Sequence, residues 1–136
     1  MNLQTANETL DEKYKRAITA FNDDPEASFL ILLECANAGH AESQLSVAIC
    51  YAKPFGTKRD YDAALDWYKA ALENPELPES SRHHAISLLE DLDVEIFHDQ
   101  EIKDEQTKRQ LLGNTRSLLH HFSSTGQHRP ERPISP

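Results

Sequence analysis

The sequence predicts an all-α protein built from about three helical hairpins, and three observations support this fold class. Apolar residues recur with the 3.6-residue period of an α-helix along most of the chain. Proline and glycine stand between these periodic segments, where they end one helix or begin the next. The segment WYKAA at 67–71 repeats the pattern of LLECA at 32–36, and this offset of 35 residues is typical of a two-helix repeat.

The first two helices are expected at about 10–21 and 25–38. One face of the first carries apolar side chains, those of Tyr14, Ala17, Ile18 and Phe21. Asp24 is a typical N-cap, and Pro25 is a typical first residue of a helix. Gly39 is the usual left-handed residue just beyond a helix end. These two helices are interpreted as a degenerate first repeat.

The clearest hairpin lies between 41 and 72, with helices expected at 41–52 and 61–72. On the first helix one seam consists of Ala41, Leu45, Ala48 and Ala52. On the second it consists of Tyr61, Ala64, Trp67 or Tyr68, and Ala71. The opposite face of the second helix is polar and carries Asp62, Asp66, Lys69 and Glu73. Because aromatic side chains fill space between helices, Trp67 is expected to be buried between neighbouring pairs.

The last two helices are expected at about 79–92 and 104–122. Their seams consist of Ala85, Leu88, Leu89 and Leu92, and of Leu111, Thr115, Leu118 and Phe122. The acidic segment 90–105 is interpreted as a solvated linker between them. Residues 1–122 are therefore predicted to form one helical domain. Residues 123–136 contain three prolines and little apolar content, so they are predicted to be a disordered C-terminal tail.

The central hairpin also combines a helix cap, an aromatic pair and small residues at fixed offsets. The residues concerned are Ala41, Gln44, Leu45, Tyr51, Gly56, Asp60, Tyr61, Ala64, Trp67, Tyr68, Ala70 and Ala71. With this combination the stretch resembles a Sel1-like repeat, a relative of the tetratricopeptide repeat. It departs from that family in the loop KPFGT at 53–57, which is usually richer in glycine. The resemblance implies a short α-solenoid that binds other proteins, and it implies no reaction.

Charge and composition restrict the class of partner and the location. The chain has 136 residues, with 14 Lys and Arg, 23 Asp and Glu, and a net charge of −9. This acidic balance disfavours nucleic acid and suits a basic protein partner. No run of about 18 apolar residues is present to span a membrane. The N-terminus lacks the features of a signal peptide, and Cys35 and Cys50 lack metal-ligand spacing, so a cytoplasmic protein with reduced thiols is predicted.

No catalytic, cofactor-binding or metal-binding residue is predicted. The histidines at 83–84 and 120–121 are adjacent pairs, whose side chains point about 100° apart on a helix and do not converge on a metal. Asp91, Asp93 and Glu95 alternate as in a calcium loop, but Ile96 stands where an EF-hand needs glycine. Neither G-x-S-x-G nor a glycine-rich phosphate loop occurs. Enzymatic activity is therefore not expected.

The candidate partner-binding residues lie in two places. Ser43, Ser46, Val47 and Cys50 are on the side of helix 41–52 away from its seam. The resemblance to tetratricopeptide arrays implies that the first helix of each pair lines the concave face, so these small side chains would leave a groove for a partner segment. Asp91, Asp93 and Glu95 would steer a basic partner toward one end of the domain.

These observations favour a non-enzymatic protein-protein interaction module of the adaptor or scaffold type. The alternative within binding functions is a bacterial immunity protein that binds and neutralises a cognate toxin or effector. The acidic surface slightly favours this alternative, because it would attract a basic toxin domain. A metal-dependent or thiol enzyme is a more distant interpretation. Self-association is another, and it would depend on exposure of Leu30 and Ile31 in the apolar run 29–33.

Overall fold

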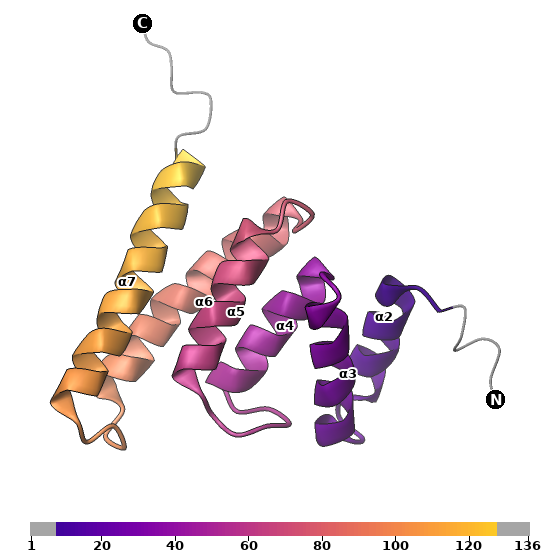
Figure 1. The fold of residues 1–136 in the computed structure, drawn as a ribbon, viewed down its shortest axis with the longest axis horizontal. Helices are drawn as coiled ribbons and strands as arrows, with labels where there is room; N and C mark the ends of the chain where they lie inside the picture. Colours follow the sequence, from indigo (N-terminus) through magenta and orange to yellow (C-terminus); the bar gives the residue numbers. More distant parts are fainter. Residues whose placement is uncertain (1–7, 128–136) are drawn as a thin grey trace, which may run out of the picture. The chain divides into compact units, whose positions relative to one another are not determined.

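The computed structural model describes residues 8–127, with side chains up to Ser123. This part of the chain contains six α-helices and no strand, which confirms the all-α fold class (Figure 1). The helices are α2 (Leu10–Ala20), α3 (Pro25–Asn37), α4 (Ala41–Ala52), α5 (Tyr61–Glu73), α6 (Glu79–His98) and α7 (Glu105–Gln127). The chain divides into two compact units, Met1–Leu77 and Pro78–Pro136, where the sequence predicted one helical domain.

In the first unit the helices pack in chain order, α2 on α3, α3 on α4 and α4 on α5 (Figure 1). The two hairpins therefore stack through the contact between α3 and α4. One buried core cluster draws on three of these helices and consists of Ala17, Phe29, Leu32, Ala36, Val47 and Cys50. Each hairpin thus buries an apolar face against the other, as in a helical repeat protein.

The helix starts follow local capping chemistry. Oδ1 of Asp24 accepts a hydrogen bond from Ala27 N at 3.2 Å, and Oδ1 of Asp60 accepts one from Ala63 N at 3.0 Å. Thr9 and Glu12 form a capping box at the start of α2, a feature beyond those predicted from the sequence. Gly39 has a φ of 95°, as expected for a residue that follows a helix end.

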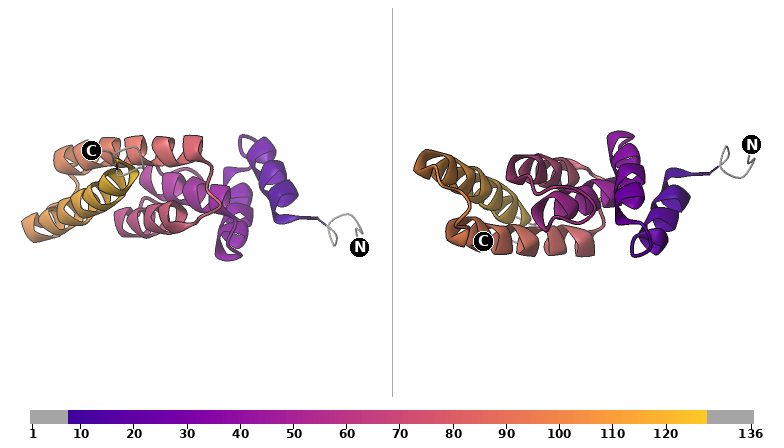
Figure 2. Two further views of the ribbon diagram at one scale, coloured as in Figure 1. Left: turned by 90° about the horizontal axis from the view of Figure 1, so that it is seen from above. Right: turned by 90° about the horizontal axis from the view of Figure 1, so that it is seen from below.

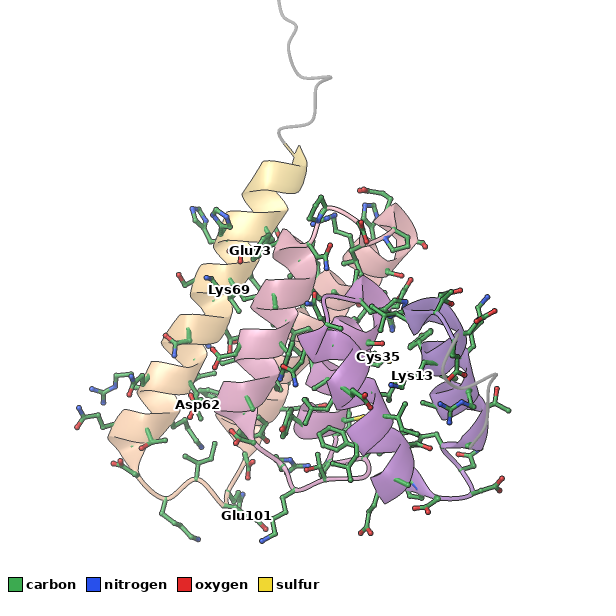
Figure 3. All side chains as sticks on the ribbon, turned by 45° about the vertical axis from the view of Figure 1, so that its right-hand side comes forward. Lys13, Cys35, Asp62, Lys69, Glu73 and Glu101 are labelled. Carbon is green, nitrogen blue, oxygen red and sulfur yellow. The ribbon has the colours of Figure 1, made fainter. Side chains whose placement is uncertain are left out.

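The seams of the central hairpin are largely as predicted. Ala41, Leu45, Ala48 and Ala52 are buried, whereas Asp62, Asp66, Lys69 and Glu73 are exposed. Three of these polar residues, Asp62, Lys69 and Glu73, can be followed along α5 in Figure 3. The expectation for Trp67 is met only in part, because it is half-buried at the edge of the core cluster while Tyr68 is 1% exposed. Ile18, which belongs to the apolar face predicted for the first helix, is exposed.

The second unit is a hairpin of α6 and α7, and the chain reverses direction between them (Figure 2). Both helices are longer than predicted, since α6 continues beyond 92 to His98 and α7 continues beyond 122 to Gln127. Ile96 extends the buried seam of Leu89 and Leu92, which explains why α6 continues through the acidic segment. Residues 123–127 of the expected tail are therefore helical, and 128–136 lie outside the described residues.

Candidate protein-binding surface

The candidate groove on α4 is absent from the described structure, because most of its residues are buried. Ser43 and Val47 are 0% exposed, Cys50 is buried, and Ser46 is half-buried. The physical reason is that α4 packs against α3 on one side and α5 on another, so the side away from the predicted seam is covered as well. The assignment of Ser43, Val47 and Cys50 to a partner-binding surface was therefore wrong, while Ser46 keeps part of its surface exposed.

His40 explains how the buried polar residue Ser43 is accommodated. The Nδ1 atom of His40 accepts a hydrogen bond from Ser43 N at 3.2 Å and lies 2.8 Å from Ser43 Oγ, so the imidazole caps α4. Its Nε2 atom lies 3.5 Å from Oδ1 of Asp11. The order Asp, His, Ser resembles a hydrolase triad, but the Ser43 hydroxyl is enclosed and a substrate cannot reach it. Histidine is an uncommon N-cap, so the sequence pattern did not predict this role for His40.

A second polar link joins the ends of the two hairpins in the first unit. Nε2 of Gln44 donates to Ala36 O at 3.2 Å, and Nδ2 of Asn74 donates to Oε1 of Gln44 at 3.1 Å and to Gly39 O at 3.0 Å. Asn74 and Gly39 are separated by the same 35 residues as the sequence repeat. These hydrogen bonds satisfy polar groups at the ends of α3, α4 and α5. They also help to fix how the second hairpin is aligned on the first.

The two cysteines lack the properties of a nucleophile. Burial raises the pKa of the Cys35 thiol, although the charge of Lys13 on the neighbouring α2 opposes this effect (Figure 3). Burial raises the pKa of Cys50 further, to about 11. Both thiols are therefore protonated at neutral pH and enclosed by the protein. They are unreactive in this state, because the thiolate is the reactive form of cysteine. The geometry therefore favours a structural role for both.

We expect ionisation of the Cys50 thiol to lower the free energy of unfolding at alkaline pH. An unfolded thiol ionises near its ordinary pKa of 9.0, and the native thiol ionises near 11. The raised native pKa favours the folded state fully below pH 9, and this contribution is lost as the pH rises through 11. Urea denaturation across this window should show a smaller loss of stability in Cys50→Ala than in the wild type. Equal losses would show that Cys50 ionises as freely in the folded protein as in the unfolded one.

The predicted acidic residues lie on α6 and not in a linker. Asp91 is exposed, whereas Asp93 and Glu95 are half-buried. Oδ1 of Asp93 accepts a hydrogen bond from Nε of Arg116 on α7 at 2.9 Å, so this carboxylate is already paired across the hairpin. The structure therefore does not bring the three carboxylates onto one solvent-facing site. Asp91 is the one most accessible to a partner.

An apolar pair lies beside Asp91 on the exposed side of α6. Val94 and Phe97 are each 56% exposed, one helical turn apart. Glu90 and Asp91 are also exposed and occupy the preceding turn on the same side. We call these four residues, Glu90, Asp91, Val94 and Phe97, the α6 outer face. The helix predicted from the sequence ended at 92 and so excluded this pair, although the apolar residues Val94, Ile96 and Phe97 continue beyond that point.

Neither a metal site nor a membrane span is found among the described residues. No group of three or more His, Cys, Asp or Glu side chains in this part of the chain is arranged to hold a metal ion. No helix in the same part is long and apolar enough to cross a membrane.

Comparisons with known proteins yield one structural similarity. No family model and no curated protein matches the chain. Among solved structures, the chain is similar to the crystal structure of a Sel1 repeat protein from Oxalobacter formigenes, with 23% sequence identity and a TM-score of 0.47. The similarity covers 78% of this chain and 41% of that chain, so it spans less than half the length of the matched protein.

Proposed function

We propose that the protein is a non-enzymatic protein-protein interaction module of the adaptor or scaffold type, and that it binds through the α6 outer face. The observation that carries this proposal is the exposed apolar pair Val94 and Phe97 beside the exposed carboxylates of Glu90 and Asp91. An exposed apolar patch with a polar rim is typical of a docking surface. This pattern suits a partner with Lys or Arg beside an apolar side chain.

The two kinds of residue in the α6 outer face would contribute differently to binding. Full burial of a side chain such as Phe97 contributes about 1.5–3 kcal/mol. Val94 and Phe97 would therefore supply most of the affinity. The carboxylates of Glu90 and Asp91 are exposed, so they would mainly accelerate association with a basic partner, an effect that salt screens.

A second candidate function is neutralisation of a basic toxin or effector by an immunity protein. The net charge of −9 and the carboxylates of the α6 outer face favour it, because they would attract a basic toxin domain. Co-expression with a toxin encoded next to this gene tests this function: restored growth would support it. Growth arrest despite a folded protein would exclude immunity to that toxin.

The binding surface can be tested with charged substitutions at exposed sites. Tagged wild-type protein should capture a specific partner from extracts of its native host, and the purified partner should then bind directly. The double variant Val94→Lys/Phe97→Lys should weaken this binding at least about tenfold, a change of about 1.4 kcal/mol. Leu30→Lys is the matched control, because Leu30 is exposed on α3 and lies outside the α6 outer face. A partner that binds the double variant as tightly as the wild type would contradict the assignment.

A further inference from the structure

A second exposed aromatic residue lies in the loop between α4 and α5, and the backbone of this loop is tightly held. Phe55 is 49% exposed, while its backbone N donates to Cys50 O at 2.9 Å. Gly56 has a φ of 73°, and a Cβ atom there would lie 2.4 Å from Pro25 O at the start of α3. The loop backbone therefore rests directly on α3. Phe55 is presented at a fixed position, which lowers the entropic cost of binding.

The same loop carries three basic residues. Lys53, Lys58 and Arg59 lie within seven residues, in a chain whose net charge is −9. The guanidinium of Arg59 is held in place, since its Nε donates to Ala52 O at 3.4 Å and its Cζ lies 5.6 Å from the centre of the Tyr61 ring. Lys58 is exposed. We call the four residues Lys53, Phe55, Lys58 and Arg59 the basic loop.

We propose that the basic loop of one molecule docks on the α6 outer face of a second copy. The two surfaces are complementary in both chemistry and charge. Phe55 matches the apolar pair Val94 and Phe97, and the exposed ammonium group of Lys58 matches the carboxylates of Glu90 and Asp91. This inference rests on the proposed function, because it uses the same α6 outer face. The molecule that binds this face is here a second copy of the chain.

The symmetry and the strength of this contact follow from its two surfaces. The surfaces differ, so the contact is heterologous, and a molecule bound through its loop leaves its own α6 outer face open to a third copy. One loop on one helix face buries less than the roughly 1,200 Å² typical of stable complexes, so the association is weak and depends on concentration. A separate protein that carries a basic and apolar segment would compete for the same face.

Analytical ultracentrifugation of the full chain over a range of concentrations tests this proposal. The average mass of the wild type should rise above the monomer value of 15.4 kDa as concentration increases. Phe55→Glu removes the apolar side chain of the loop and adds a repelling charge, and Val94→Lys does the same on α6. Both positions are exposed, so circular dichroism should show wild-type helix content. Each variant alone should remain a monomer.

The mixture of the two variants provides the decisive measurement. The intact α6 outer face of Phe55→Glu should bind the intact loop of Val94→Lys, so the mixture should form a pair of twice the monomer mass and grow no further. A wild type that stays monomeric at every concentration would overturn the proposal. So would a mixture that stays monomeric while the wild type associates. If the wild type is monomeric but Val94→Lys/Phe97→Lys still loses a partner protein, only self-association is rejected and the proposed function stands.

Discussion

The Val47→Arg variant should fail to fold under conditions in which the wild type is stable. Val47 is 0% exposed and belongs to the core cluster with Phe29, Leu32 and Cys50. An arginine there would bury a guanidinium without a partner, which costs several kcal/mol, and would overfill a packed site. A domain of this size is stable by only about 5–15 kcal/mol. Circular dichroism should therefore show lost helicity or a melting transition shifted far below that of the wild type.

Leu30→Arg is the matched control for this experiment. It introduces the same side chain on the adjacent helix α3, at a position that is 63% exposed. Its spectrum and its unfolding transition should stay close to those of the wild type, since surface substitutions usually change stability by less than about 0.5 kcal/mol. A folded Val47→Arg protein with a wild-type transition would show that the side chain faces solvent, and the groove predicted on α4 would have to be reconsidered.

The failure of the groove prediction has a physical cause that a single sequence does not reveal. The seam of Ala41, Leu45, Ala48 and Ala52 was identified correctly. A helix with neighbours on two sides also buries residues outside such a seam, and small polar residues serve there if they find hydrogen bonds. Ser43 finds one with His40, and Gln44 finds one with Ala36. In the sequence these residues have the same pattern as a solvent-facing side of a helix.

Helix ends were predictable where a residue with a local mechanism marks them. Asp24 and Asp60 cap α3 and α5 as predicted, and Gly39 follows α3 in a left-handed conformation. The end of α6 carries no such signal, because neither glycine nor proline follows His98. Its length is instead set by packing, since Ile96 continues the buried seam of the helix. For this reason the helix expected at 79–92 did not include the apolar pair of the α6 outer face.

Of the two neighbouring aromatic residues on α5, Tyr68 should contribute more to stability than Trp67. Tyr68 is 1% exposed, so Tyr68→Ala should leave a cavity and cost about 3–5 kcal/mol, as for other large aromatic residues in a core. Trp67 packs against the core cluster from its edge and keeps part of its surface in water. Trp67→Ala should therefore cost less, about 1–2 kcal/mol. Urea denaturation of both variants measures the two free energies of unfolding.

The comparison of these two variants also tests the orientation of α5. Asp66→Ala is the control, because Asp66 is exposed on the same helix and its substitution leaves the core intact. Adjacent residues point about 100° apart on a helix, so the two rings lie in different surroundings. If Trp67→Ala costs more than Tyr68→Ala, α5 must be rotated about its axis toward the orientation that the sequence first suggested. The opposite order would confirm Tyr68 as the more deeply buried of the two rings, with Trp67 at the edge of the core.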